Sequence, residues 1–118
     1  MGSIHIKRIY EPAEKQDGKR LLVDRLWPRG LKKETARLDE WMKDIAPSTE
    51  LRKWFHQDTT RWDEFRLKYL HELQQNDAVN TLLNLVKNNQ RVTLLYAAHD
   101  EQQNHALILQ HFITEKLK

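Results

Sequence analysis

Two short apolar runs constrain the fold of this 118-residue chain most strongly. Residues 20–23 read Arg-Leu-Leu-Val, and residues 91–98 read Arg-Val-Thr-Leu-Leu-Tyr-Ala-Ala. Each run is too short for a helix, and the second is rich in the β-branched and aromatic residues of a strand buried on both faces. Because segments with helical spacing separate the runs, we predict a small single α/β domain over residues 1–118. Its sheet is expected to be mostly parallel and flanked by helices in a Rossmann-like three-layer arrangement.

The other elements follow from apolar spacing and from turn residues. Residues 4–10 begin with an apolar alternation that predicts a further short strand. The first helix is inferred from Leu38, Trp41, Met42 and Ile45, which share one helical face, and it ends before Pro47. Ser48 is the expected N-cap of the next helix. Helices are expected over residues 35–46, 49–55, 58–75, 79–86 and 104–117.

Composition excludes several kinds of chemistry. The chain has no cysteine, so disulfides, thiolate nucleophiles and sulfur-ligated zinc are ruled out. No apolar run approaches the roughly 20 residues of a membrane span, and a signal peptide is not evident, so we expect a cytoplasmic protein. His99, His105 and His111, each six residues apart, match no recognised zinc spacing. We therefore expect no metal site and no cofactor.

Positive charge is concentrated in the first third of the chain. Residues 1–37 hold ten Lys or Arg against five Asp or Glu, whereas the remaining 81 residues hold ten against twelve. The first third therefore carries a net charge of +5 and the rest of the chain −2, which together give the formal net charge of +3. This distribution favours an anionic ligand or partner, although a merely solvated basic surface explains it equally well. Lys32 and Lys33 give only weak support for nucleic-acid binding.

Polar side chains follow both apolar runs. Ligands of parallel sheets bind beyond the carboxyl ends of the strands, so these side chains meet if the two strands are neighbours. Arginine binds oxyanions, tryptophan stacks on planar rings, and the start of the last helix favours an anion. Pro28 and Gly30 make residues 27–30 a shaped loop. The predicted ligand-binding residues are Arg25, Trp27, Arg29, Tyr96, His99, Asn104 and His105.

Three functions fit this arrangement. The leading one is binding of a small anionic ligand, either nucleotide-like or derived from nucleic acid. The second is a hydrolase or transferase acting on a phosphorylated substrate, with Asp24 or His99 as general base and the arginines stabilising developing charge. The third is a nucleic-acid or protein interaction module that uses the basic first third as its surface.

Several of these side chains also have a purely structural interpretation. Asp24 paired with Arg25 or Arg29 fixes a loop more often than it catalyses a reaction. Trp27 before a proline can simply cover the core. The aromatic residues with helical spacing are expected to pack in the core or between helices, namely Trp41, Trp54, Trp62 and Phe65.

Four segments together resemble a known protein family. They are residues 24–30 (Asp-Arg-Leu-Trp-Pro-Arg-Gly), residues 38–41, residues 45–53, and residues 94–98 followed by Asn104-His105-Ala106. Over nearly the whole chain they resemble the YeaO-like branch of the domain-of-unknown-function 488 family. The resemblance implies an α/β domain of bacterial type with no established activity.

The chain departs from the family's pattern at the end of the late strand. Relatives in the wider family have a cysteine there and another near the last helix, where this chain has Tyr96 and the Asn104-His105 pair. Thiol chemistry therefore does not transfer from those relatives. The nearer branch is expected to have a serine and a Lys or Arg where this chain has Ala97 and His99. An anion contact at His99 is expected to depend on pH, because histidine changes charge near neutrality.

Overall fold

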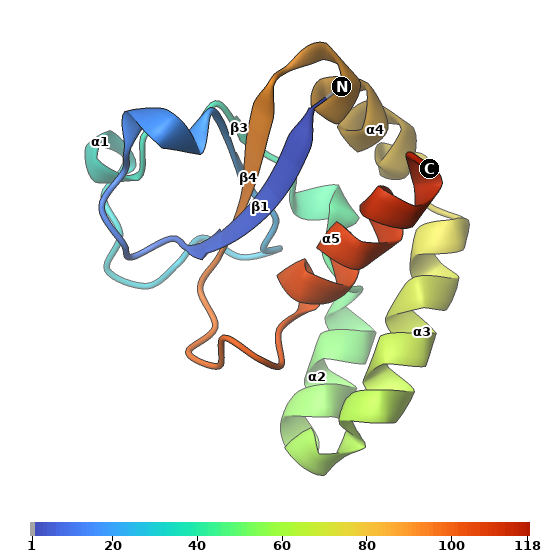
Figure 1. The fold of residues 1–118 in the computed structure, drawn as a ribbon. Coiled ribbons are helices and arrows are strands. Elements are labelled where there is room, and N and C mark those ends of the chain that lie inside the picture. Colours follow the sequence, from blue (N-terminus) through green and yellow to red (C-terminus); the bar gives the residue numbers. More distant parts are fainter. Residues whose placement is uncertain (1) are drawn as a thin grey trace.

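Four parallel strands form one sheet in the computed structural model, which describes residues 2–118 (Figure 1). The strands are β1 (Ser3–Arg8), β2 (Lys19–Leu22), β3 (Glu40–Trp41) and β4 (Arg91–Tyr96), in the order β1-β4-β2-β3. The two apolar runs of the sequence are therefore the inner strands β2 and β4. They lie side by side, with Leu21 paired with Leu94 and Leu22 with Leu95. The prediction of a parallel α/β domain is confirmed.

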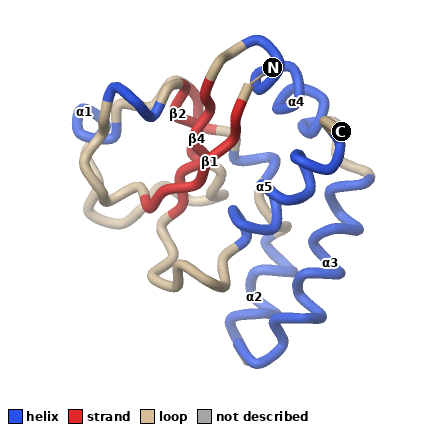
Figure 2. The backbone as a smooth tube through the Cα atoms, viewed as in Figure 1, coloured by secondary structure: helices blue, strands red, loops and turns tan. Residues whose placement is uncertain are grey.

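Five helices complete the fold (Figure 2). They are α1 (Lys33–Ala36), α2 (Thr49–Gln57), α3 (Trp62–Gln74), α4 (Ala78–Asn88) and α5 (His105–Lys116). Figure 1 places α2 to α5 to one side of the sheet, whereas the single turn α1 and its flanking loops lie on the other side. The arrangement has three layers, and the layer that contains α1 is thin.

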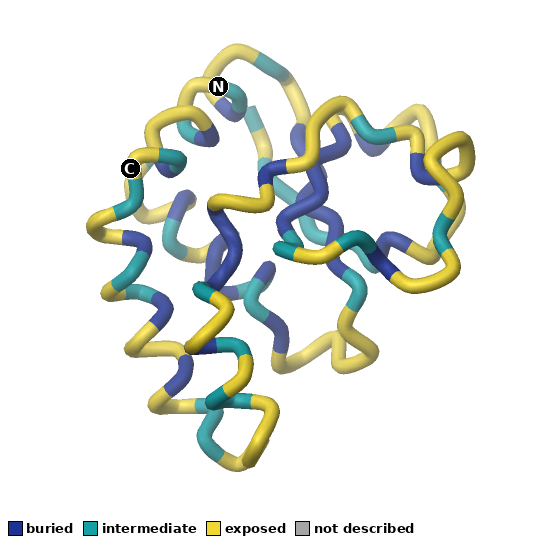
Figure 3. The backbone as a smooth tube through the Cα atoms, turned by 180° about the vertical axis from the view of Figure 1, so that it is seen from behind, coloured by how far each residue is buried: buried dark blue, intermediate teal, exposed yellow. Residues whose placement is uncertain are grey.

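The strands alternate their side chains between two apolar clusters. Leu21 and Leu94 face the larger cluster, which includes residues of α2 to α5, and Leu22 and Leu95 face a smaller one with Ala36 of α1. All four of these strand leucines are fully buried. Figure 3 shows the buried residues concentrated in the middle of the molecule, with exposed residues along the loops around it. The inner strands therefore form a fixed base for the loops that follow them.

The helix expected over residues 35–46 is wrong. Helix α1 ends at Ala36, because Arg37 takes a left-handed conformation with φ 48° and ψ 50°. The chain then pairs with the free edge of β2, where Met42 N–H donates to the Leu22 carbonyl (2.8 Å). The edge of β2 needs partners for its backbone groups, and this requirement outweighs the helical spacing. Leu38, Trp41, Met42 and Ile45 lie instead on an extended segment followed by a 3-10 turn.

The other predicted helices are confirmed, and two of them begin at side-chain caps. Ser48 Oγ accepts a hydrogen bond from Leu51 N (3.1 Å) at the start of α2, as expected. Asn104 Oδ1 accepts one from Leu107 N (2.9 Å) at the start of α5. Each cap satisfies an amide that would otherwise lack a partner in the first turn. The starts of α2 and α5 are thereby fixed, and both border the site described below.

A buried ion-pair network joins the sheet to the α1 layer. Asp17 and Arg20 are each only 4% exposed, and Arg20 Nη1 lies 2.6 Å from Asp17 Oδ2. Lys7 Nζ lies 3.1 Å from the same carboxylate, and Arg20 Nη2 donates to the Ala36 carbonyl (2.8 Å). Thr93 of β4 donates to the main-chain oxygen of Asp17. Lys7 and Arg20, two of the basic residues in the first third of the chain, therefore have internal partners.

This network lowers the pKa of Asp17. Burial by itself raises the pKa of the carboxyl, but the backbone N–H of Glu14 and the side chains of Lys7 and Arg20 together hold it below its ordinary value. An ordinary Asp carboxyl titrates near pH 4. Because the pKa of Asp17 is lower in the folded state, its ionised carboxylate stabilises the protein at pH values above about 4. That stabilisation is lost as the pH falls below about 4.

We predict that Asp17→Asn lowers the free energy of unfolding by about 3–5 kcal/mol, because Lys7 and Arg20 lose their buried partner. Urea unfolding at pH 7 measures the loss, and unfolding between pH 5 and 2 should show a weaker acid dependence than the wild type. Glu115→Gln is the matched control, since its ion pair with Lys118 is exposed. An Asp17→Asn variant with wild-type stability and acid dependence would contradict this assignment.

Candidate functional site

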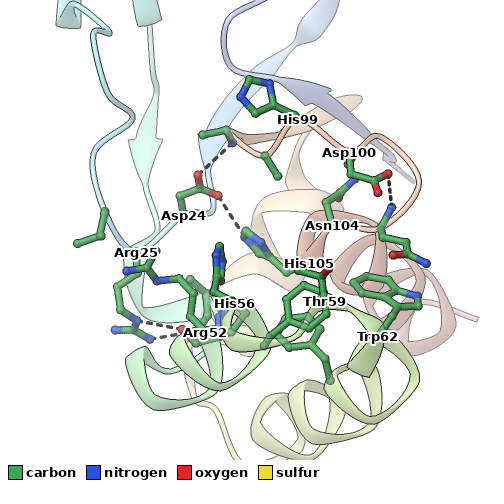
Figure 4. Close-up of a pocket in the computed structure, with 18 residues that line it drawn as sticks. Asp24, Arg25, Arg52, His56, Thr59, Trp62, His99, Asp100, Asn104 and His105 are labelled. Carbon is green, nitrogen blue, oxygen red and sulfur yellow. Dashed lines mark hydrogen bonds and ion pairs between the residues drawn. The ribbon is translucent and has the colours of Figure 1, made fainter.

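A cavity of about 500 Å³ opens beyond the carboxyl ends of β2 and β4 (Figure 4). Its walls come from residues 24–26 after β2, residues 97–105 around the β4–α5 loop, and helices α2 and α3. The two strand ends are adjacent because the pairing of β2 with β4 continues to Val23, whose N–H donates to the Leu95 carbonyl (3.0 Å). This edge is where parallel sheets usually carry ligand sites.

The structure brings five of the eight predicted site residues to the cavity and places three elsewhere. The five that line the cavity are Asp24, Arg25, His99, Asn104 and His105. The three that do not are Trp27, Arg29 and Tyr96. The late-strand loop therefore contributes nearly all of its predicted residues, and the Arg/Trp loop contributes only its beginning.

The three outlying residues have other surroundings. Trp27 donates its indole N–H to the Leu31 carbonyl (2.8 Å) and packs edge-on against Trp41, with ring centroids 5.4 Å apart. Tyr96 is buried in the larger apolar cluster, and this burial raises the pKa of its hydroxyl. Arg29 is exposed. Trp41 is 38% exposed on the edge strand, so the expectation that it packs in the core is wrong.

Asp24 links the ends of the two inner strands. Its Oδ2 accepts a hydrogen bond from Ala97 N (3.0 Å), just beyond β4. Its Oδ1 lies 3.2 Å from His105 Nε2, and that nitrogen is 2.8 Å from the Val23 carbonyl. Because a carbonyl oxygen only accepts, Nε2 of His105 carries a hydrogen. Asp24 and His105 thus fix β2, β4 and the start of α5 against one another.

Arg25 shapes one wall of the cavity by binding the segment before α2. In this segment, four consecutive carbonyls each accept a hydrogen bond from a side chain elsewhere in the fold, which makes it rigid. Buried Tyr69 is one donor, and its burial raises the pKa of its hydroxyl well above the ordinary value, so the group stays neutral. The acceptors are Asp44 from Asn76 (2.9 Å), Ile45 from Tyr69 (2.8 Å), and Ala46 and Pro47 from Arg25 (3.1 Å each).

Arg52 is the cavity residue that sequence reasoning missed most clearly. It lies in the first half of α2, four residues before His56, so both face the cavity from the same side of the helix. The guanidinium of Arg52 makes no hydrogen bond or ion pair with any of residues 2–118, and its Nε is buried. The only sequence signal was this spacing of four, which is also typical of a solvated helix face.

Three aromatic rings form another wall. Phe55 of α2 packs against Phe65 of α3 (ring centroids 4.5 Å apart), and Trp62 lies nearly parallel to Phe65 (5.6 Å, 26°). All three line the cavity. The sequence predicts such packing for Trp62 and Phe65, and the three rings do pack against one another. Their position beside the cavity also provides a flat apolar surface on which a planar ring can stack.

The loop from β4 to α5 is held by hydrogen bonds of its own. Asp100 Oδ1 accepts from the backbone N–H groups of Gln102 (2.8 Å) and Gln103 (3.0 Å). Asn104 donates from its side chain to the Asp100 carbonyl (3.0 Å), so both ends of its amide are engaged. Arg8 of β1 donates to the Ala98 carbonyl (2.9 Å) beside the exposed His99. The loop is therefore a fixed wall.

The described part of the chain limits the chemistry of the site. Thr59 supplies the one side-chain hydroxyl among the described residues that line the cavity. Within residues 2–118, no three His, Asp or Glu side chains are grouped so as to hold a metal ion. None of the helices in this range is long and apolar enough to span a membrane.

Comparisons with known proteins identify one protein family and several similar relatives. Residues 3–118 match the protein family described as the inactive DUF488-N3 subclade. The chain is 52% identical over 107 residues to uncharacterized protein YeaO of Escherichia coli K12, covering 91% of this chain and 93% of that protein. It is 40% identical over 106 residues to uncharacterized protein Rv3073c of Mycobacterium tuberculosis H37Rv, covering 90% and 89% respectively. No solved structure matches the chain.

We predict that Arg25→Met lowers the free energy of unfolding by about 1–3 kcal/mol, because the carbonyls of Ala46 and Pro47 lose their donor. Urea unfolding measures this loss, and amide hydrogen exchange should become faster at the start of α2. Arg29→Met is the matched control, since the Arg29 side chain is exposed and forms no hydrogen bond within residues 2–118. Equal stability of the two variants would show that Arg25 does not hold this wall.

Proposed function

This chain belongs to the inactive DUF488-N3 subclade, and we propose that it binds a small anionic, nucleotide-like ligand in the cavity beyond β2 and β4. The observation that carries the proposal is the guanidinium of Arg52, a permanent cation that borders the cavity without a partner among the described residues. A partly buried charge is costly unless an opposite charge or hydrogen-bond acceptors compensate it. A bound oxyanion supplies both.

The charges around the cavity support an anion. Of its two carboxylates, Asp100 accepts hydrogen bonds from the backbone N–H groups of Gln102 and Gln103. Asp24 accepts one from Ala97 N at Oδ2, whereas its buried Oδ1 has no hydrogen-bond partner within residues 2–118 and lies 3.2 Å from His105 Nε2. Arg52 has no such compensation. The first turn of α5 also borders the cavity through His105, and the positive end of a helix dipole favours negative charge.

The aromatic wall and the size of the cavity support a ligand that also carries a planar ring. Phe55, Trp62 and Phe65 offer the stacking surface, and Arg52 lies on the same helix as Phe55. A volume of about 500 Å³ falls within the usual range for small-molecule sites. An anionic group joined to a flat ring describes a nucleotide-like molecule. The absence of cysteine supports the cytoplasm as the place where this binding occurs.

Binding has more support than hydrolysis or group transfer. The Asp24 carboxylate holds the strand ends together, and the other proposed base, His99, is exposed beside Arg8. The description of the subclade as inactive agrees with a site that binds without turnover. A basic interaction surface has less support, because four of the ten basic residues in the first third already have internal partners, namely Lys7, Arg8, Arg20 and Arg25.

We predict that a bound anion raises the melting temperature in an Arg52-dependent manner. A ligand at 100 times its Kd adds about 2.7 kcal/mol, which shifts the midpoint of a domain of this size by several degrees. Differential scanning fluorimetry with inorganic phosphate, ribose 5-phosphate and the four common 5′-mononucleotides measures the shift.

Arg52→Gln should abolish the shift, and Lys53→Gln, on the exposed neighbouring position of α2, should retain it. The proposal fails if no probe in this panel shifts the wild type, or if the shift survives Arg52→Gln. A shift produced only by nucleic acid, with a steep dependence on salt, would also overturn it in favour of a basic surface.

A further inference from the structure

We infer that the cavity accommodates one 5′-mononucleotide, with its phosphate at Arg52 and its base against Trp62, and not a segment of a nucleic-acid strand. This inference rests on the proposed function and goes further by assigning the two ends of the ligand. Figure 4 shows Arg52 and Trp62 on opposite sides of Thr59 and His105. The cavity is therefore cationic at one end and aromatic at the other.

The α2–α3 hairpin explains this polarity. Arg52 lies near the start of α2, and Trp62 is the first residue of α3, next to the turn at residues 58–61. Arg52 lies five residues before Gln57, the last residue of α2, so at about 1.5 Å per residue the two are about 7.5 Å apart along the helix axis. One nucleotide carries its phosphate and its base at its two extremities, so a single unit can contact both ends.

The phosphate end has two basic side chains on one helical face. Arg52 can approach an oxyanion with two parallel N–H groups, and His56 follows four residues later on the same side. The segment of Ala46 and Pro47, fixed by Arg25, borders the cavity close to this end. A rigid wall at this position favours a terminal phosphate over a phosphodiester that continues to another nucleotide.

The base end provides a ring surface, and the cavity lining also offers an uncommitted amide. Trp62 is half-buried and lies nearly parallel to Phe65, which leaves part of its indole for a ligand. Gln103 borders the same cavity, and its side chain makes no hydrogen bond with the described residues. A primary amide both donates and accepts, as the edge of a nucleobase requires.

Tryptophan fluorescence tests the orientation directly, because Trp62 is the only one of the four tryptophans that lines the cavity within residues 2–118. Trp27 and Trp41 pack against each other, and Trp54 lies against Arg61 and Lys68. A stacked base should quench the emission of the wild type. Trp62→Phe should lose this quenching, and Trp54→Phe should retain it, with both variants first checked for wild-type melting temperature.

Calorimetric titration with AMP, adenosine, inorganic phosphate and an eight-nucleotide oligoadenylate then separates the contributions of the phosphate, the base and a continuing strand to binding. We expect AMP to bind at least ten-fold more tightly than adenosine or phosphate, and the oligoadenylate to bind no more tightly than AMP. The inference is overturned if adenosine matches AMP, if the oligomer binds more tightly, or if quenching by AMP persists in Trp62→Phe.

The outcomes distinguish the inference from the function on which it rests. Arg52-dependent stabilisation by ribose 5-phosphate, with no binding of any of the four common 5′-mononucleotides, overturns the assignment of a mononucleotide and leaves anion binding intact. Binding of AMP that is unchanged in Arg52→Gln overturns both. Arg52-dependent binding of AMP with quenching lost only in Trp62→Phe supports both.

Discussion

The carboxylate of Asp24 is the contact on which the geometry of the site depends. It follows β2 and accepts a hydrogen bond from Ala97 N, just beyond β4, so it closes the two inner strands where their regular pairing ends. His105 donates to the Val23 carbonyl beside it and fixes the first turn of α5 to the same point. Three walls of the cavity thus share one hydrogen-bonded junction. The most conspicuous acid of the sequence acts first as a structural link, which is the more common role of such a residue.

The basic residues divide into those that hold the fold together and those that are available. Lys7 and Arg20 pair with buried Asp17, Arg8 binds the loop after β4, and Arg25 binds the segment before α2. Arg52 has no protein partner within the described chain, and it belongs to the later part of the chain, where the net charge is negative. Formal charge along the sequence therefore gave a poor guide to the cation that faces the cavity.

Local pattern was sufficient to predict the sheet and most helices, because short apolar runs and side-chain caps act within a few residues. It failed over residues 35–46, where the edge of β2 recruits a partner strand from a segment with helical spacing. The strand-end principle located the cavity and five of its residues. It missed Arg52 and Trp62, because their roles depend on how the α2–α3 hairpin packs beside a loop distant in sequence. Trp27 and Arg29 belong to the same motif as Asp24, but Trp27 packs against Trp41 and Arg29 is exposed, so neither lines the cavity.

The most direct test of this account is a backbone amide NMR titration of the whole chain with AMP. The account predicts that chemical-shift changes concentrate at residues 24–26, 52–62 and 97–105, which surround the cavity. The chemical shifts of residues 28–37, which carry exposed Lys and Arg side chains in the α1 layer, should not change. Shifts confined to residues 28–37, or none at any AMP concentration, would contradict a ligand site at the ends of β2 and β4.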